Sequence, residues 1–165
     1  MARTETYPHE IFADLIQDHD RHRDLIARIE ATEGESPERK RLFKELTKEI
    51  KGHAAAEEQA LWSTILRKPE TTSEARHAVA EHKELEDLFN QLAATDMATS
   101  GWLNRFHKLK EEYLHHIEEE EEEIFPASAK VLTQEDRSWM ASVFEKRKPI
   151  EKGKAEVTPK EEPEH

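Results

Sequence analysis

The sequence repeats a pattern of histidines, glutamates and apolar residues at one constant separation. A histidine with a glutamate four residues later occurs as His53 and Glu57, and again as His116 and Glu120. We call the distance from His53 to His116 the repeat separation. It also relates two single histidines and six apolar pairs: His19 with His82, Phe43 with Phe106, Leu46 with Leu109, Leu61 with Ile124, Trp62 with Phe125, Ile16 with Val79, and Leu25 with Leu88. Because one separation serves polar and apolar positions alike, we interpret the chain as an internal duplication of a two-helix unit.

Apolar residues and histidines fall on one face of four long predicted helices, at about residues 9–32, 37–67, 73–94 and 101–125. Ser36 and Pro37 predict an N-cap and first helical residue, and Pro126 is expected to end the fourth helix. Gly52, next to His53, indicates either close packing of a neighbour or a local distortion. The short links predict an all-α, up-down-up-down four-helix bundle, with residues 9–126 as its core.

A shorter fifth helix is predicted after the bundle. Thr133 and Asp136 resemble an N-cap and first-turn acid, and the helix is expected to end near Lys146. Residues 147–165 are highly charged and interrupted by prolines, so we expect a disordered tail after a single domain of residues 1–146.

Composition narrows the classes of partner. The formal charge of −12 argues against nucleic acid or an anionic membrane surface as the main partner. The absence of cysteine excludes disulfides, thiolate ligands and iron–sulfur clusters. Because neither a signal peptide nor a long apolar stretch is visible, a cytoplasmic protein is expected.

The repeated histidines and glutamates predict a metal site at the centre of the bundle. Four imidazoles and two carboxylates are too many for one tetrahedral zinc ion and suit two ions that share the carboxylates. Imidazole with carboxylate suits iron, manganese, cobalt or zinc. Two dications carry more charge than two carboxylates neutralise, which favours an oxide or hydroxide bridge. Open positions should remain for a small molecule.

The segments HAAAEEQALW, from His53, and HIEEEEEEIFP, from His116, together with the two single histidines, resemble the hemerythrin-like (HHE cation-binding) family over residues 9–126. That family is a four-helix bundle with a non-haem di-iron centre that binds or reacts with dioxygen, and related members handle peroxide, nitric oxide or iron sensing. The resemblance implies two iron ions, favoured over manganese or zinc, with the histidines as terminal ligands and the glutamates as bridges: His19, His53, His82, His116, Glu57 and Glu120.

The sequence differs from the oxygen-carrying hemerythrins, which have five histidines and an aspartate in place of one glutamate. Ala78 stands four residues before His82, where a fifth histidine would be expected. This difference favours reaction or sensing over reversible oxygen transport.

Further polar residues are candidates for the surroundings of the metals. His22, three residues after His19, would be a fifth ligand, a pocket hydrogen-bond donor or a core residue. Glu49 and Glu112, each four residues before a ligand histidine, would hold its N–H or lie on the surface.

Three further predictions concern residues near the histidine–glutamate pairs. Tyr113 would form a hydrogen bond to a bound oxygen species or pack in the core. Glu123 would guard an entrance or belong to a solvated face. Glu58 and Glu121 are expected to point outward.

Three functional hypotheses follow. The leading one is a di-iron protein that binds or reacts with dioxygen or peroxide, in redox or iron-linked stress protection or sensing. An enzymatic form of it would dismutate peroxide, as a catalase does. The alternative is a metal-dependent interaction switch, an iron or oxygen sensor that acts through a partner protein.

Overall fold

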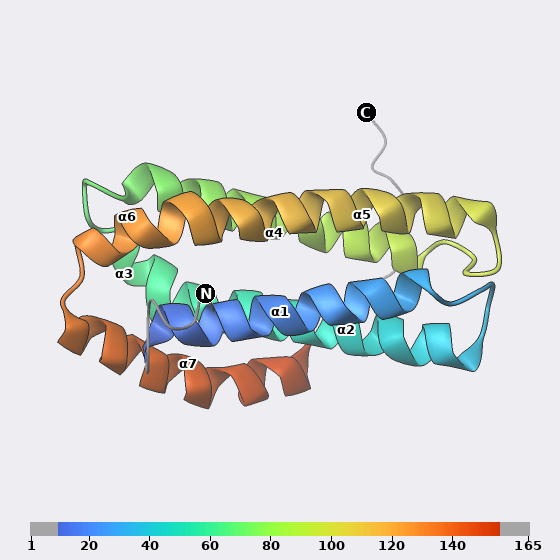
Figure 1. The fold of residues 1–165 in the computed structure, drawn as a ribbon, viewed down its shortest axis with the longest axis horizontal. Coiled ribbons are helices and arrows are strands. Elements are labelled where there is room, and N and C mark those ends of the chain that lie inside the picture. The colour runs from blue at the N-terminus through green and yellow to red at the C-terminus, as the bar shows by residue number, and fades with distance from the viewer. Residues whose placement is uncertain (1–9, 156–165) are drawn as a thin grey trace.

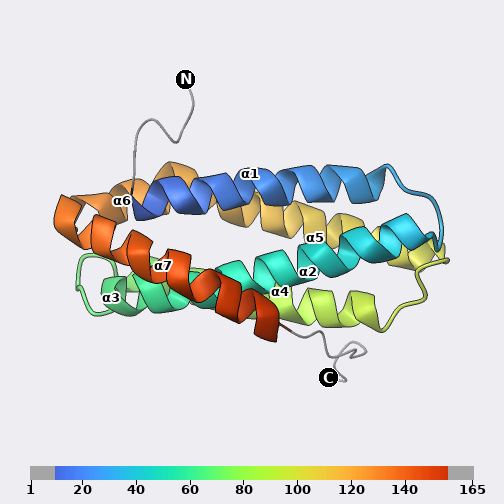
Figure 2. The same ribbon diagram turned by 90° about the horizontal axis from the view of Figure 1, so that it is seen from below.

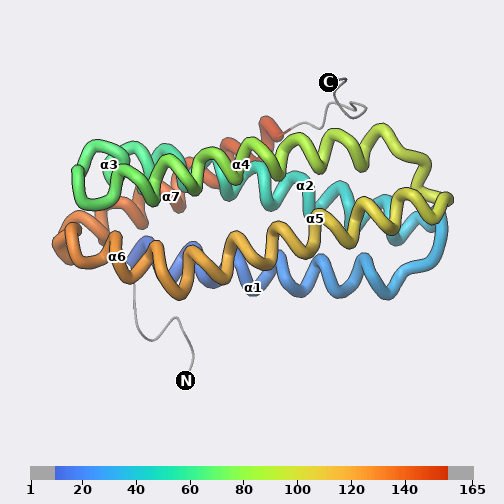
Figure 3. The backbone as a smooth tube through the Cα atoms, turned by 90° about the horizontal axis from the view of Figure 1, so that it is seen from above, coloured from blue at the N-terminus to red at the C-terminus, as the bar shows by residue number. Residues whose placement is uncertain are grey.

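Four long helical rods form an antiparallel bundle in the computed structural model, which describes residues 10–155 (Figure 1). The rods are α1 (Ile11–Glu30); α2 (Pro37–Glu57) with η2 (Glu58–Trp62) and α3 (Ser63–Ile65); α4 (Thr72–Ala93); and α5 (Ser100–Glu119) with η3 (Glu120–Ile124) and α6 (Phe125–Lys130). Helix α1 contacts α2 and α5, and α4 contacts the same two helices, so the rods follow one another around the bundle (Figure 3). The predicted up-down-up-down bundle is confirmed.

Local capping explains where several helices begin. The Ser36 side chain accepts a hydrogen bond from the backbone N–H of Arg39, with Pro37 as the first helical residue. The preceding turn contains Gly34 at a φ of 59°, a left-handed conformation that favours glycine. Thr133 and Asp136 form a reciprocal capping box. These caps fix the first residues of α2 and α7.

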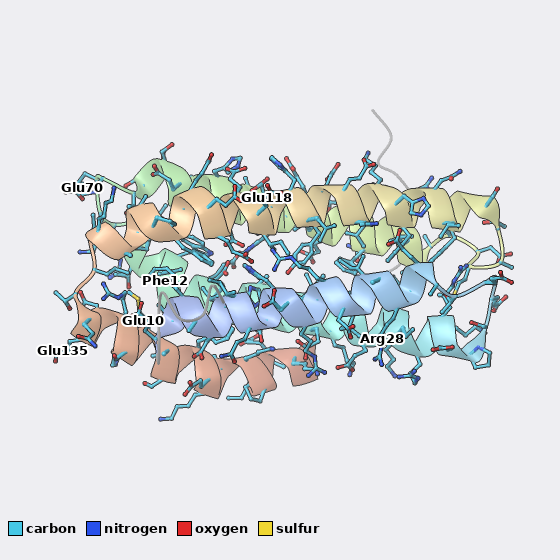
Figure 4. All side chains as sticks on the ribbon, in the orientation of Figure 1. Glu10, Phe12, Arg28, Glu70, Glu118 and Glu135 are labelled. Atoms are coloured by element: carbon cyan, nitrogen blue, oxygen red, sulfur yellow. The ribbon has the colours of Figure 1, made fainter. Side chains whose placement is uncertain are left out.

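Two apolar clusters fill the bundle, one at each end. The cluster near α6 and α7 includes Phe12, Leu15, Trp62 and Phe125. The cluster near the 31–36 and 94–99 links includes Leu46, Phe89, Trp102 and Phe106. Phe12 points between the rods, whereas Arg28, Glu118 and Glu135 lie on the outside (Figure 4). A polar layer separates the two clusters.

The fourth rod continues beyond Pro126, so the predicted helix end is wrong. Pro126 is the second residue of α6, which runs from Phe125 to Lys130. At the start of a helix the missing proline N–H leaves no hydrogen bond unmade, and the segment immediately before α6 is the π-helix η3 rather than an α-helical turn.

The fifth helix is longer than predicted. Helix α7 spans Gln134–Lys154 and lies obliquely across α2, with further contacts to α1 (Figure 2). The expected disorder is therefore wrong for residues 147–154, whereas residues 156–165 of the expected tail lie outside the described residues. The lysines of this segment pair with acids on the bundle: Lys148 Nζ lies 2.7 Å from Asp18 Oδ1, and Lys152 Nζ lies 2.7 Å from Glu49 Oε1.

Gly52 provides the space for α7. A Cβ atom at this position would lie 2.8 Å from Lys152 Cα and 2.9 Å from its nitrogen. Of the two explanations for this glycine, close packing of a neighbouring helix is the one observed. Within residues 10–155, no helix is both long and apolar enough to span a membrane.

Candidate metal centre

The six residues predicted as ligands converge in the polar layer between the two apolar clusters. They form two groups whose ligand atoms lie within 4.8 Å of one another, and each group draws a histidine from each of two helices. The first group is His19, His53 and Glu57; the second is His82, His116 and Glu120. We call these groups the first and second triads. Each member of the second triad follows its counterpart in the first by the repeat separation, so the duplication carries over into a pseudo-twofold site.

Both carboxylates lie between the triads. Glu57 Oε2 lies 3.2 Å from His53 Nε2, and its other oxygen lies 3.2 Å from His82 Nε2. Glu120 Oε1 lies 3.0 Å from His116 Nε2 and 3.6 Å from His19 Nε2. Each carboxylate therefore approaches one histidine of each triad, which is where a bridging ligand would lie.

Every histidine of the triads is oriented by a further carboxylate at its Nδ1 atom. The distances are 2.7 Å for His19 with Glu121, 2.8 Å for His53 with Asp18, 3.0 Å for His82 with Glu58, and 2.8 Å for His116 with Glu81. An ionised carboxylate only accepts hydrogen bonds, so Nδ1 carries the proton and Nε2 presents its lone pair to the centre. Metal-binding histidines are commonly oriented in this way.

These four orienting acids differ from the predicted ones. Glu58 and Glu121 were expected to point outward. That prediction is wrong for Glu121, whose side chain is buried against His19, whereas the side chain of Glu58 is 41% exposed and nevertheless contacts His82. Glu49 and Glu112 were candidates to hold His53 and His116, but Asp18 and Glu81 occupy those Nδ1 atoms instead.

A sequence signal for the orienting acids was available. Asp18 and Glu81 are related by the repeat separation, and each stands directly before a single histidine of the repeat. Glu58 and Glu121 are related in the same way, and each stands directly after a bridging-position glutamate. Extending the repeat to every acidic residue would have included all four, together with Glu49 and Glu112, which do not occupy these Nδ1 atoms.

Several polar atoms at the centre are buried and lack hydrogen-bond partners among the described residues. They include Nε2 of His19 and of His53, Oε2 of Glu57, and both carboxylate oxygens of Glu120. Leaving such atoms unpaired in an interior is costly. Imidazole nitrogen with carboxylate oxygen is a donor set suited to divalent transition metals. The residues present therefore fit a pair of bound cations.

Protons would compete with a cation for these atoms. Burial lowers the pKa of His19 well below its ordinary value, which keeps the imidazole neutral. Burial alone would also lower the pKa of His53, but its contacts with Asp18 and Glu57 raise it to about 10. Burial and the neighbouring Glu57 raise the pKa of Glu120. Cation binding should therefore release protons and weaken at low pH.

Two π-helical segments adjoin the bridging-position glutamates. Segment η2 follows Glu57 directly, and η3 begins at Glu120. Such segments are rare and frequently mark functional sites. In η2 the indole N–H of Trp62 donates to Glu57 Oε1, five residues earlier.

The wider π-helical turn also explains why Glu123 belongs to the solvated face, one of its two predicted placements. Glu123, seven residues after His116, would return to the inner face of a regular α-helix, but it is exposed and the next residue, Ile124, is buried instead. Because a π-helical turn contains more residues than an α-helical one, the inner face falls one position later.

His22 and Tyr113 form a buried pair beside the first triad. His22 Nδ1 lies 2.6 Å from the Tyr113 hydroxyl, and His22 Nε2 lies 3.4 Å from Glu49 Oε2. The His22 ring packs edge-on against His53, with 5.2 Å between ring centroids. His22 is absent from both triads, but with Asp18 and His53 it forms another, largely buried group whose ligand atoms lie within 4.8 Å of one another. Whether it binds a metal stays a prediction.

A cavity of about 460 Å³ between α2 and α4 reaches His53, His82, His116 and Tyr113. Its apolar lining includes Ile50, Ala54, Val79, Leu85 and Phe89. Lysines and glutamates also line it, among them Lys83 and Glu151, and the end of α7 contributes Lys154 and Ala155. This cavity gives a small molecule room beside the candidate metal centre.

An antiparallel four-helix bundle with imidazoles and carboxylates converging at mid-height defines a class of metal-binding helical proteins. The model of the hemerythrin HHE cation binding domain matches residues 10–128, and the chain belongs to this family. Membership implies metal binding, with iron as the usual cation.

A solved structure shares the fold. The crystal structure of a hemerythrin HHE cation binding domain-containing protein from Mycobacterium kansasii matches with a TM-score of 0.79 and 23% identity, over 88% of each chain. At this identity the likeness concerns the fold. No curated protein matches the sequence significantly.

Proposed function

We propose that this protein holds two iron ions, one at each triad, and that it binds or reacts with dioxygen or peroxide in redox protection or iron-linked sensing. The observation that carries the proposal is the set of buried Nε2 and carboxylate atoms without hydrogen-bond partners among the described residues. Glu57 and Glu120 would bridge the ions, since each approaches a histidine of both triads.

The number of ligand atoms at each triad would leave open coordination positions on each ion. Each triad offers two imidazole nitrogens and one carboxylate oxygen, and the bridging carboxylate of the other triad adds a fourth donor. A hard or borderline divalent ion commonly takes five or six ligands, so room remains for a small molecule. Iron held there would supply the electrons for chemistry on an oxygen species.

The chain's own residues would control access and hydrogen bonding at the centre. The buried side chains of Leu15, Leu46, Leu85 and Leu109 belong to the two apolar clusters on either side of the polar layer and would limit water. Tyr113 lines the cavity. Burial raises its pKa well above 10, so the hydroxyl keeps its proton for a hydrogen bond.

The first experiment is elemental analysis of protein purified without added metal. We expect about two iron ions per chain, as two triads imply, and near-ultraviolet and visible absorption that changes when the anaerobically reduced protein meets air or peroxide. Glu123→Gln, at an exposed position, should behave as the wild type. An iron-loaded protein whose absorption spectrum stays unchanged with both air and peroxide would contradict the proposal.

The response of the protein to added peroxide distinguishes binding from catalysis. Repeated oxygen release, lost in Glu57→Ala, would identify a dismutating enzyme, whereas bleaching by one equivalent would limit the activity to binding.

A metal-dependent switch is the second candidate, and the polar layer between two apolar clusters favours it. Removing the cations would leave four imidazoles and two carboxylates buried without an ion, which should loosen the bundle. We expect a chelator to lower the melting temperature by several degrees, roughly the effect of 1–2 kcal/mol in a domain of this size. An unchanged melting temperature would argue against the switch.

A further inference from the structure

A further group of side chains able to ligate a metal lies on the outside of the bundle, beside the second triad. His77 Nε2 lies 3.2 Å from Glu81 Oε1 and 2.9 Å from Glu119 Oε1. One ligand atom from each of these residues lies within 4.8 Å of the others. His115 extends the group, with its Nε2 atom 3.3 Å from Glu119 Oε2. The residues come from two helices, α4 and α5, so the bundle itself holds them together.

We propose that His77, Glu81 and Glu119 form an outer site for one divalent cation such as Zn²⁺. One imidazole nitrogen and two carboxylate oxygens are donors that such an ion accepts, and solvent would complete its coordination. Glu81 belongs to the inner arrangement as well, because the same oxygen lies 2.8 Å from His116 Nδ1. The outer cation would thus share a carboxylate with a histidine of the second triad.

The local chemistry favours a cation at this position. Two carboxylates, from Glu81 and Glu119, approach one nitrogen of one imidazole. A neutral imidazole nitrogen offers at most a single N–H, which cannot satisfy both oxygens, and the two negative charges repel each other. A divalent ion would accept both oxygens and the nitrogen lone pair together.

The pseudo-twofold relation gives an independent argument. Asp18, the counterpart of Glu81, orients His53 and also receives the ammonium group of Lys148 at 2.7 Å. Thus in the first half of the bundle, α7 supplies a positively charged ammonium group that pairs with the orienting carboxylate. Helix α7 packs on the α1 and α2 side (Figure 2).

The second half has a different arrangement around its orienting carboxylate. Among the described residues, the ion-pair partners of Glu81 are the imidazoles of His77 and His116. The counterparts of His77, His115 and Glu119 in the first half are Asp14, Gly52 and Ala56, which do not reproduce this donor set. A bound ion would therefore place positive charge beside Glu81, as Lys148 does beside Asp18.

The outer site is tested by adding Zn²⁺ to the protein as purified, dialysing it, and measuring zinc and the resident metal separately. We expect one zinc ion per chain beyond the resident metal, without loss of that metal. His77→Ala should weaken this additional binding by about tenfold or more, because it removes the nitrogen donor. The matched control is His107→Ala, since His107 is as exposed as His77, at 49%, and also faces a carboxylate.

Two results would overturn the proposal. One is equal zinc uptake by the wild type, His77→Ala and His107→Ala. The other is zinc uptake that only replaces the resident metal. The comparison of the two variants isolates a single ion, so it holds whichever metal the inner triads carry and does not depend on the proposed reaction with oxygen.

Discussion

The first half of the bundle, α1 with α2, and the second half, α4 with α5, present matching residues to the centre and different residues to the outside. In the first half, Trp62 holds one oxygen of Glu57, and α7 covers the helices. In the second half, the counterpart of Trp62 is Phe125, which has no N–H to donate, and both oxygens of Glu120 lack a hydrogen-bond partner among the described residues. The duplication thus preserved the inner donors, while their supports diverged.

Removing a bridging-position carboxylate should have the largest effect. Glu57→Ala removes the oxygens that face His53 and His82, whereas Glu120→Ala removes one that approaches His116 and, less closely, His19. We expect both variants to retain about one metal ion per chain or fewer, with the greater loss in Glu57→Ala. Elemental analysis checks this, and a full complement in either variant would contradict the bridging role.

Neutralising an orienting acid should have the next largest effect. Asp18→Asn and Glu81→Gln should each lower metal affinity by roughly 10–100-fold, the range typical of partners that orient ligand histidines. The loss should be greater for Asp18→Asn, because the Lys148 ammonium then lies near the first triad without that countercharge. Competition with a chromogenic chelator measures both affinities. Equal losses would show that Lys148 plays no part.

Glu49 should make the α7 contact sensitive to pH. Burial alone would raise its pKa, but the close contacts with His22, Lys152 and Lys148 hold the pKa well below the ordinary 4.5. A lowered folded-state pKa stabilises the protein above the unfolded pKa, and this contribution is lost progressively as the pH falls from about 4.5 toward the lowered folded-state pKa. Glu49→Gln should therefore cost about 2 kcal/mol at pH 7 and less at pH 3, where part of the contribution has been lost.

Urea unfolding of both proteins at the two pH values measures this difference. Release of the resident metal at low pH affects the wild type and the variant alike, so the comparison between them isolates Glu49. A cost that stays constant between pH 7 and pH 3 would mean that the charge of Glu49 does not stabilise the contact.

The smallest predicted effect concerns the contact between α2 and α7. Gly52→Ala would bring a Cβ within 3 Å of the Lys152 backbone, so α7 must shift. Overpacking costs typically 1–3 kcal/mol and the gain in helix propensity returns up to about 1 kcal/mol, which leaves a net loss of about 1 kcal/mol. Gly153→Ala is the control, because nothing lies within 4 Å of its added Cβ. Thermal melting should fall for the first variant and rise slightly for the second.

The bundle and the convergence of the six central residues were predictable because both depend on regular helical spacing. Side chains four residues apart share a helix face, and the repeat brings equivalent faces together. Residues 147–154 were not predictable in this way. Their own composition favours disorder, and the acids that pair with Lys148 and Lys152 lie far earlier in the chain, on α1 and α2.

Regular helical geometry alone misplaces some of the acids. Of the two predicted placements of Glu123, the solvated face is observed, because η3 changes the register that would bring the seventh residue after His116 inward. Glu58 and Glu121 were placed outside by the same helical geometry, which ignores how far a glutamate side chain reaches toward a neighbouring helix. The repeat separation relates these acids, but it also relates Glu49 to Glu112, so only the structure identifies which acids orient the histidines.

The two π-helical segments bear on how the protein arose. A turn of this kind holds a residue more than its α-helical equivalent. Had one copy acquired that residue alone, the spacing between copies would differ before and after the segment. Yet His53 and His116, which precede the segments, are as far apart in the sequence as Leu61 and Ile124 within them. The simplest history is that the extra residue was already present in the ancestral hairpin when its gene was copied, so the widened turns are as old as the paired centre they adjoin.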